Sequence, residues 1–188
     1  MNKKGKLVII SAPSGGGKTT VIRELLKKMK GVGRVITSTS REKRKGERNK
    51  VDYHFLSRDE FEARIKKNKF YEYAEYAGNY YGVDKDVLKE TLQTYRFAFA
   101  PLDIQGKKHM DSIGLDHISI FLIPESLDLL QKNISKRGGM DPKELKKRMA
   151  VAQKEINESV VYDYQIQNRE GHLDAVIDEI KHILEEYA

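Results

Sequence analysis

Residues 6–20 read KLVIISAPSGGGKTT. The first six residues form a continuous apolar run bounded by charge and by Pro/Gly, which is typical of a buried strand in a parallel sheet. Residues 12–17 form a glycine-rich turn, and residues 18–29 have the apolar spacing of a helix. A strand, a glycine turn and a helix in this order predict the opening of an α/β fold.

The turn carries a phosphate-binding pattern, G-x-x-x-x-G-K-[ST], with Ala12 in place of the first glycine. Its backbone N–H groups and the N-terminus of the following helix favour anions. In this motif Lys18 reaches the β- and γ-phosphates and the Thr19 hydroxyl coordinates Mg²⁺. The alternative, a glycine-rich turn that binds nothing, is disfavoured by the strand before it and the helix after it. We therefore expect an enzyme that binds a nucleoside triphosphate through Ala12, Pro13, Ser14, Gly15, Gly16, Gly17, Lys18, Thr19 and Thr20.

The amino-acid composition excludes several kinds of functional site. The chain has 188 residues, a formal net charge of +7 and no cysteine, which excludes disulfides, thiolate metal sites and cysteine nucleophiles. No apolar run is long enough for a signal peptide or a membrane span, so we expect a cytoplasmic protein with no membrane partner. The basic balance indicates an anionic partner, either a nucleic acid or a small phosphorylated molecule.

The remaining elements follow from apolar periodicity and capping residues. Pro101 does not suit a central strand, so it lies at the carboxyl end of one or shortens it. Residues 34–95 are richer in aromatics and charge than the flanks and read as an inserted lobe. We expect strands over 34–39, 51–56, 70–76, 97–102, 117–122 and 164–168, and helices over 57–67, 84–94, 125–136, 142–159 and 173–187.

A second candidate phosphate site lies in residues 37–55. Arg41 and Arg44 are three residues apart and Tyr53 follows the first by twelve. Guanidinium groups match phosphate oxygens bidentately, so these side chains could clamp a phosphate monoester. The alternative is an ordinary solvated basic loop.

Several motifs together resemble the guanylate kinase family. They are the phosphate loop, T-S-R-x-x-R-x-G-E, V-D-Y-H-F, E-x-A-E-Y-x-G-N-Y-Y-G, L-D-I-Q-G, I-F-L-I-P-E-S, K-R-G, K-K-R-M-x-x-A-x-x-E and Y-D-Y-x-I-x-N. The resemblance runs from about Lys6 to the C-terminus. It implies a P-loop core with a parallel sheet and helices on both faces, an acceptor-binding lobe and a helical lid. The corresponding segments are a core at about 1–33, 96–124 and 160–188, a lobe at about 34–95 and a lid at about 125–159.

The activity implied by the resemblance is Mg²⁺-assisted phosphoryl transfer from ATP to GMP, and to dGMP. The implied GMP-phosphate residues are Arg41, Arg44, Tyr53 and Tyr81. Glu72 and Asp103 match carboxylates that accept from the guanine N–H groups, and Thr37 stands where the family has a serine donor to the base carbonyl. Taken alone, Glu72 could equally be one more exposed charge in an alternating strand.

The lid and the donor site are implied in the same way. Arg137 and Arg148 match lid arginines that reach the transferring group, which with Lys18 and Arg41 make the implied catalytic set. The alternative for Arg148 is an i,i+4 ion pair with Glu144. Asn168 matches a residue near the ATP base, although a turn-forming asparagine is equally plausible.

Three departures from the family pattern leave alternatives open. Val83 replaces a serine or threonine, Pro101 replaces an aspartate near Mg²⁺, and Lys43 replaces a proline. A related kinase with a different or relaxed acceptor, or a weakly active binding module, are therefore alternatives. A nucleic-acid binder is a further hypothesis, but placing the cations at the three phosphate-facing segments favours small nucleotides. A monomer and a homodimer are both compatible with the sequence.

Overall fold

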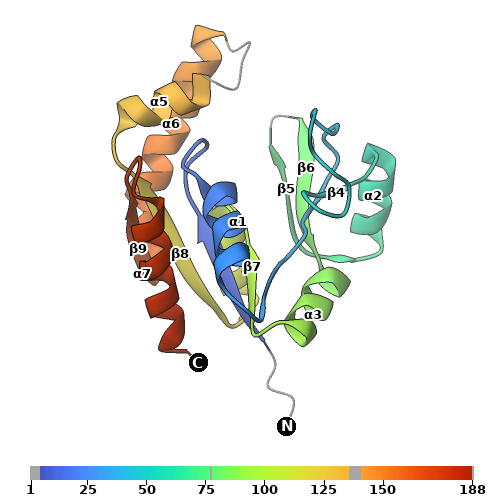
Figure 1. Ribbon diagram of the computed structural model, residues 1–188. Helices are drawn as coiled ribbons and strands as arrows, with labels where there is room; N and C mark the ends of the chain where they lie inside the picture. The colour runs from blue at the N-terminus through green and yellow to red at the C-terminus, as the bar shows by residue number, and fades with distance from the viewer. Residues whose placement is uncertain (1–4, 77, 136–140, 188) are drawn as a thin grey trace. The chain divides into compact units, whose positions relative to one another are not determined.

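The computed structural model describes residues 5–76, 78–135 and 141–187 (Figure 1). Two sheets organise the chain. The first has the strand order β2-β7-β1-β8-β9, and its β2–β7 and β8–β9 pairs are parallel. Its strands are β1 (Lys6–Ser11), β2 (Val32–Arg34), β7 (Phe97–Ala100), β8 (His117–Pro124) and β9 (Tyr164–Asn168). The second has the order β4-β3-β6-β5, from β3 (Ser38–Thr39), β4 (His54–Phe55), β5 (Phe70–Tyr76) and β6 (Asn79–Asp84).

Helices begin where the sequence supplies caps. Ser57 and Glu60 form the expected capping box at the start of α2, and Asp84 and Asp141 cap α3 and α6. No helix in the described ranges is long and apolar enough to cross a membrane. The helices are α1 (Lys18–Lys28), α2 (Arg58–Lys66), α3 (Lys85–Thr94), α4 (Ile104–Ser112), α5 (Leu127–Ser135), α6 (Pro142–Glu158) and α7 (Leu173–Glu185), with a 3₁₀ turn η1 (Ser159–Val161).

The chain divides into two compact units, each with its own apolar core. The first unit comprises the residues up to Val8, Gly31–Pro101 and Gln105–His117. Within it the Phe61 ring of α2 stacks on Phe70 of β5 at 4.4 Å between centroids, which attaches the helix to the second sheet.

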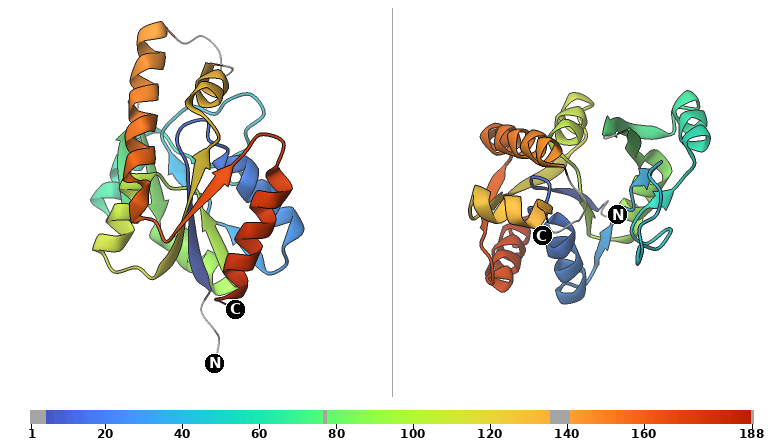
Figure 2. Two further views of the ribbon diagram at one scale, coloured as in Figure 1. Left: turned by 90° about the vertical axis from the view of Figure 1, so that its left-hand side faces the viewer. Right: turned by 90° about the horizontal axis from the view of Figure 1, so that it is seen from above.

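The second unit comprises Ile9–Lys30, Leu102–Ile104 and the residues from Ile118 onward. Helices α5 and α6 pack together through buried Leu130, Ile134 and Ala152 (Figure 2). Helix α7 packs on α1 and β9. The phosphate loop and β9 therefore both belong to the second unit.

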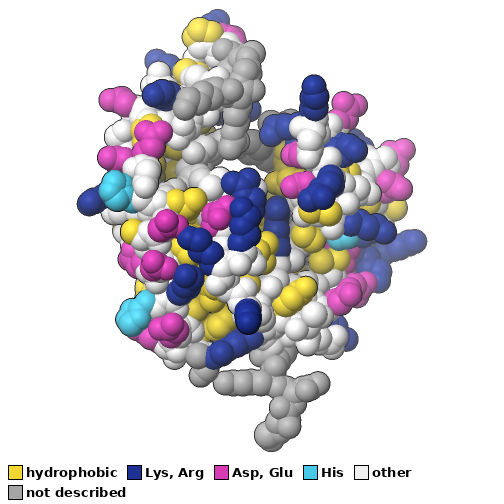
Figure 3. Space-filling view, viewed as in Figure 1, with side chains coloured by type: hydrophobic (Ala, Val, Ile, Leu, Met, Phe, Trp, Pro, Cys, Tyr) yellow, Lys and Arg dark blue, Asp and Glu magenta, His cyan; other side chains and the backbone are white. Residues whose placement is uncertain are grey.

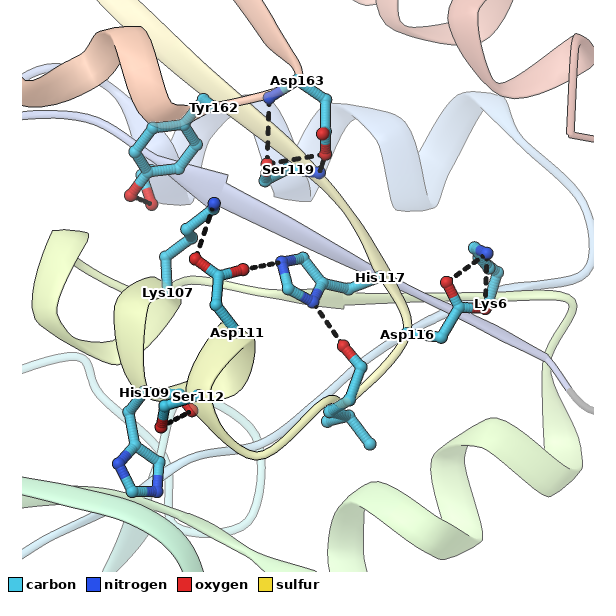
Figure 4. A network of polar contacts seen from close by, with 12 residues as sticks. Lys6, Lys107, His109, Asp111, Ser112, Asp116, His117, Ser119, Tyr162 and Asp163 are labelled. Atoms are coloured by element: carbon cyan, nitrogen blue, oxygen red, sulfur yellow. Dashed lines mark hydrogen bonds and ion pairs between the residues drawn. The ribbon is translucent and has the colours of Figure 1, made fainter.

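Polar networks fix the start of β8 (Figure 4). In the first unit, Lys107 Nζ lies 2.8 Å from Asp111 Oδ2, and His117 Nε2 lies 3.3 Å from Asp111 Oδ1. In the second unit, Asp163 Oδ2 accepts hydrogen bonds from the backbone N–H and the hydroxyl of Ser119, both at 2.7 Å. These contacts satisfy buried polar groups at strand ends, where the sheet ladder cannot.

Four sequence expectations differ from the structure. The expected strand 34–39 is divided, because the chain leaves β7 after the Val35 N–H bonds to Phe99 O and joins β6 at Ser38. The expected strand 51–56 shortens to His54–Phe55, because Asp52 accepts from Arg48 N–H in a turn. Strand β6 occupies residues 79–84, where the sequence predicts no strand. Helix α4 was not expected, since a central glycine and few apolar residues hide it. Strand β7 ends at Ala100, so Pro101 lies beyond its carboxyl end, as one alternative predicted.

Candidate active site

The phosphate loop joins β1 to α1 as the motif requires. Gly17 is the N-cap of α1 with φ +91°, a left-handed conformation that glycine adopts without strain. Lys18 Nζ donates to the carbonyl oxygen of Ala12, so the ammonium group folds back over the loop. Ala12 is 2% exposed, and a Cβ on Gly16 would lie only 2.9 Å from the Ala12 Cβ, so this position has little room for a larger residue.

Asn168 holds the loop from the end of β9. Its Nδ2 donates to Gly16 O at 3.0 Å, and a Cβ on Gly17 would lie 2.6 Å from the same nitrogen. A pocket of about 110 Å³ opens here, lined by Gly15, Gly16, Gly17, Asn133, Asn168 and Arg169 among others. Glycine at position 17 is therefore required both by the backbone conformation and by the asparagine.

A carboxylate from α6 faces the same loop. Burial raises the pKa of Glu155 to about 7; Lys18 opposes this shift, and the negative charges of Asp103 and Glu158 add to it. The structure thus brings Lys18, Asp103 and Glu155 into one electrostatic neighbourhood of the second unit. Sequence reasoning gave Glu155 no role, although it is the glutamate of the K-K-R-M-x-x-A-x-x-E motif.

The residues present fit a Mg²⁺ ion that arrives with the nucleotide. Thr19 is exposed in the first turn of α1, so its hydroxyl is open to a ligand. Over the described ranges, no group of three or more His, Cys, Asp or Glu side chains could hold a metal ion. This donor set suits Mg²⁺, which in such sites takes most of its ligands from phosphate oxygens and water.

The second sheet carries Glu72 and Tyr81, two of the residues that the resemblance assigns to the acceptor nucleotide. A register shift between Phe70 and Glu72 makes a β-bulge at Tyr71. Phe70 pairs with Asp84, but Glu72 pairs with Val83, so the two side chains leave opposite faces of the sheet. Plain alternation would have placed Glu72 on the Phe70 face, against α2. The bulge instead gives Glu72 the same face as Val83 and, two residues along β6, Tyr81.

Arg41 is the centre of a cluster next to this face. Its guanidinium lies 5.7 Å from the Tyr53 ring centroid and 2.7 Å from Glu47 Oε1. Burial alone would lower the pKa of Arg41, but the Glu47 carboxylate and the Tyr81 phenol raise it above its ordinary value. The Tyr53 and Tyr81 rings meet edge to face at 6.2 Å between centroids, and burial raises the pKa of Tyr53. Arg41, Tyr53 and Tyr81 are therefore brought together in one cluster.

Arg44 has an exposed side chain, whose charge acts on the Glu47 carboxylate of the cluster. Its backbone N–H donates to Glu47 Oε2 at 2.8 Å, so Glu47 holds the Arg44 backbone and the Arg41 side chain at once. Lys and Arg side chains gather over this region of the first unit in Figure 3. The chain that follows Arg41 also carries the exposed residues Lys43, Lys45, Arg48 and Lys50.

Only one of the two predicted lid arginines, Arg148, lies among the residues that the structure describes. Arg148 lies on α6, and its Nε is 2.9 Å from Glu144 Oε1, the i,i+4 ion pair that the alternative interpretation named. Arg137 lies outside the described residues. Asp103 follows β7 in the second unit, whereas Thr37 and Glu72 belong to the first unit.

Sequence reasoning missed two positioning residues in the first unit. Glu47 bonds the Arg41 guanidinium and the Arg44 backbone N–H. Thr39 is fully buried, and its hydroxyl donates to Tyr80 O at 2.9 Å and accepts from Arg41 N–H at 3.1 Å. Both lie in the quoted T-S-R-x-x-R-x-G-E motif. The motif contains both residues, but the sequence indicated a role only for its arginines, because a positive charge points directly to an anionic ligand.

A phosphate loop between the first strand and helix of a parallel sheet, and a separate sheet bearing an arginine–tyrosine cluster, define a P-loop nucleoside monophosphate kinase. A family model described as "Guanylate kinase" matches residues 4–187. The chain belongs to the guanylate kinase family, and the resemblance found in the sequence is confirmed.

Individual relatives agree with the family. The guanylate kinase of Clostridium perfringens strain SM101 is 38% identical over 182 residues, which are 97% of this chain and 82% of that protein. The guanylate kinase of Enterococcus faecalis is 38% identical over 185 residues, or 98% of this chain and 90% of that protein. The crystal structure of guanylate kinase from Anaplasma phagocytophilum matches with a TM-score of 0.78 at 28% identity, covering 98% of this chain and 86% of that one.

Proposed function

We propose that this chain transfers the γ-phosphoryl group of ATP to GMP, and to dGMP, releasing ADP and GDP or dGDP. The observation that carries this proposal is the second sheet, where a β-bulge aims Glu72 to the face that also bears Tyr81 of the arginine–tyrosine cluster. One sheet thus offers a carboxylate acceptor for base N–H groups and cationic donors for a phosphate.

The phosphate of the acceptor nucleotide binds to the cationic donors, and its base binds to the carboxylates. Arg41 and Arg44 bind the GMP phosphate through guanidinium N–H groups, and the Tyr53 and Tyr81 phenols donate to its oxygens. Glu72 and Asp103 accept hydrogen bonds from the N1–H and 2-amino groups of guanine, and the Thr37 hydroxyl donates to the base carbonyl. Adenine lacks the N1–H donor and the 2-amino group, so it could not donate to the half-buried Glu72 carboxylate or to the exposed Asp103 carboxylate.

The donor nucleotide occupies the phosphate loop. The backbone N–H groups of residues 12–20 and the Lys18 ammonium surround the β- and γ-phosphates. Thr19 would hold Mg²⁺, which supplies positive charge to the β- and γ-oxygens when it is bound. Asn168 lies beside the ATP base.

Transfer is an in-line displacement. An oxygen of the GMP phosphate forms a bond to the γ-phosphorus of ATP while the bond from that phosphorus to the β,γ-bridging oxygen breaks, and the electron pair leaves with ADP. The phosphate is mostly a dianion at neutral pH, so no side chain needs to remove a proton. Lys18, Arg41, Arg137 and Arg148 stabilise the charge on the transferring oxygens.

Other expectations from the sequence stay predictions. They are the lobe boundaries at about 34–95 and 125–159, the cytoplasmic location, and the choice between monomer and homodimer.

A coupled assay of ADP release tests the proposed function. ATP and Mg²⁺ are held in excess while GMP, dGMP, IMP, AMP, CMP and UMP are supplied in turn, with Lys18→Ala as the background control. We expect turnover with GMP and dGMP well above the other acceptors. Rates with both guanine nucleotides equal to the Lys18→Ala background would contradict the proposal, and a clear preference for another base would identify a different acceptor.

A further inference from the structure

Two consecutive buried hydrogen bonds join three separate segments of the second unit. The Tyr162 hydroxyl donates to Ser11 Oγ at 2.8 Å, and the Ser11 hydroxyl donates to the carbonyl oxygen of Leu102 at 2.6 Å. Tyr162, Ser11 and Leu102 are 6%, 0% and 4% exposed, so these polar groups are shielded from bulk water. The two bonds therefore fix the three segments to one another.

Each of the three residues borders a segment that the proposed function uses. Ser11 ends β1 and directly precedes the phosphate loop at Ala12. Leu102 directly precedes Asp103, the carboxylate that we propose to accept from guanine. Tyr162 is the first residue after η1, which itself follows α6. The two bonds thus connect the start of the phosphate loop to the Asp103 segment and to the end of α6.

The segment that carries Asp103 lies between two regular elements. Strand β7 ends before Pro101, which has no N–H to donate to a ladder, and α4 begins only at Ile104. Leu102 and Ile104 are each 4% exposed, whereas the Asp103 side chain between them is exposed. A buried carbonyl oxygen needs a donor, and the Ser11 hydroxyl supplies one to Leu102. A side chain of the neighbouring segment therefore holds the backbone beside Asp103.

Ser11 is held more firmly than the segment to which it bonds. Its backbone belongs to β1, an inner strand of the first sheet. The Tyr162 hydroxyl occupies a lone pair of Ser11 Oγ, and the single hydroxyl hydrogen of Ser11 is directed to Leu102 O. Loss of the Ser11 hydroxyl should therefore release the Asp103 segment and leave the backbone of the phosphate loop in place.

The Asp103 segment and the phosphate loop act on one common group. Lys18 lowers the pKa of the Glu155 carboxyl group and Asp103 raises it, against a larger effect of burial. Asp103 thus lies in the same electrostatic neighbourhood as the lysine of the loop. Its exact place matters for a reaction in which an acceptor and a donor must be aligned.

We propose that Ser11 and Tyr162 are positioning residues for the acceptor nucleotide, which act by holding Asp103 in a fixed place beside the phosphate loop. Neither residue touches a substrate. Although Ser11 adjoins the loop that binds ATP, its hydroxyl serves the binding of GMP. This inference rests on the proposed function, because it assumes that Asp103 accepts a hydrogen bond from guanine.

Initial-rate kinetics of ADP release, with GMP and ATP varied in turn, compare Ser11→Ala with the natural chain. We expect KM for GMP to rise about tenfold, the effect of a buried acceptor that loses its donor, while kcat and KM for ATP change less than threefold. Thr91→Val removes a buried hydroxyl that donates to Val87 O within α3, and it is the matched control. It should leave both KM values unchanged.

A double-mutant cycle separates positioning from a general loosening of the fold. Asp103→Ala alone should raise KM for GMP about tenfold, because it removes the proposed acceptor. Adding Ser11→Ala to it should raise KM by less than twofold more, since Ser11 acts through Asp103.

Several results of these measurements would overturn the inference. They are an unaltered KM for GMP in folded Ser11→Ala, a tenfold loss shared by both substrates, a natural KM for GMP in Asp103→Ala, and a further tenfold rise in the double variant. Absence of GMP turnover in the natural chain would instead reject the proposed function.

A second variant tests the inference if Ser11→Ala does not fold. Tyr162→Phe removes only the hydroxyl and keeps the ring, which packs against Phe121 at 5.2 Å between centroids. We expect KM for GMP to rise about threefold, less than in Ser11→Ala, because the serine hydroxyl remains. In the Asp103→Ala background the same change should have no further effect.

Tyr164→Phe is the matched control for this variant. It removes a hydroxyl two residues along the chain, which lies 3.0 Å from the Tyr187 hydroxyl. It should keep the natural KM for both substrates. An unaltered KM for GMP in Tyr162→Phe, or an equal rise in Tyr164→Phe, would overturn the inference.

Discussion

The phosphate loop and the acceptor face, the two nucleotide-binding regions that we propose, are built by opposite means. The loop is a continuous segment, residues 12–20, whose backbone N–H groups and one lysine make the site. The acceptor face is the side of the second sheet that bears Glu72 and Tyr81. It is assembled from the β5–β6 hairpin and the more distant β3, and it depends on one bulge at Tyr71 to aim Glu72. A contiguous site is fixed by local conformation, whereas an assembled site is fixed by register. The predictions below test this difference, from the largest expected effect to the smallest.

Phosphoryl transfer should be almost abolished when the lysine of the phosphate loop is removed. Lys18→Ala takes away the cation that neutralises the β- and γ-phosphates, and we expect kcat to fall about a thousandfold. Circular dichroism checks that the variant is folded; Lys18 is only partly buried and donates to the carbonyl oxygen of Ala12 in the same loop. Near-normal kcat in a folded variant would exclude the loop as the donor site.

Removing Arg41 from the acceptor cluster should have a smaller effect than removing Lys18. Arg41→Ala removes a guanidinium that Glu47 and Tyr81 hold, and we expect KM for GMP to rise about thirtyfold with a smaller change in KM for ATP. Initial-rate kinetics with each substrate varied in turn measure both constants. Lys45→Ala, an exposed charge of the same segment, is the control and should change neither. A loss shared equally between the two substrates would argue against a role confined to the acceptor.

Stability should depend on the carboxyl group that faces the loop. Burial raises the pKa of Glu155 to about 7, above the ordinary 4.5, so the folded protein binds this proton more tightly than the unfolded chain. The stabilisation is fully present below pH 4.5 and is lost as the pH rises through about 7. Between pH 5 and 8 the free energy of unfolding should fall by about 2 kcal/mol more in the natural chain than in Glu155→Gln, a value reduced for partial exposure.

Urea denaturation at pH 5 and pH 8 measures this difference without nucleotide. Glu185→Gln, at the exposed end of α7, is the matched control and should follow the natural chain. Identical pH dependence in the natural chain and Glu155→Gln would show that the carboxyl group titrates normally in the folded state.

The loop conformation should matter beyond its backbone angle. Gly17→Ala imposes a left-handed φ on alanine and brings its Cβ to 2.6 Å from Asn168 Nδ2. Gly31→Ala imposes a similar φ of +70° with nothing within 4 Å. We expect a loss of about 1 kcal/mol in unfolding free energy for Gly31→Ala and about 2 kcal/mol for Gly17→Ala. Thermal unfolding of both variants measures the two losses. Equal losses would mean that Asn168 moves aside and that its contact with residue 17 costs nothing.

The same comparison explains what the sequence could predict. The strand, loop and helix of residues 6–28 were predicted correctly because all their determinants are local, as were the helix starts near residues 57, 84 and 142. Strand β6 escaped prediction because its register is set by β3 and β5, not by its own periodicity. The face that Glu72 occupies could not be derived from alternation, which gives the opposite face. Glu155 escaped notice because its burial depends on α6 packing in the second unit.

The central claim is that Glu72 recognises guanine from the acceptor face. Calorimetric binding of GMP to the natural chain and to the isosteric Glu72→Gln tests it most directly. The amide cannot accept from both N1–H and the 2-amino group as the carboxylate does, so we expect GMP affinity to fall about thirtyfold. The binding of ATP with Mg²⁺ should stay unchanged. Equal GMP affinity in the two proteins would contradict the account.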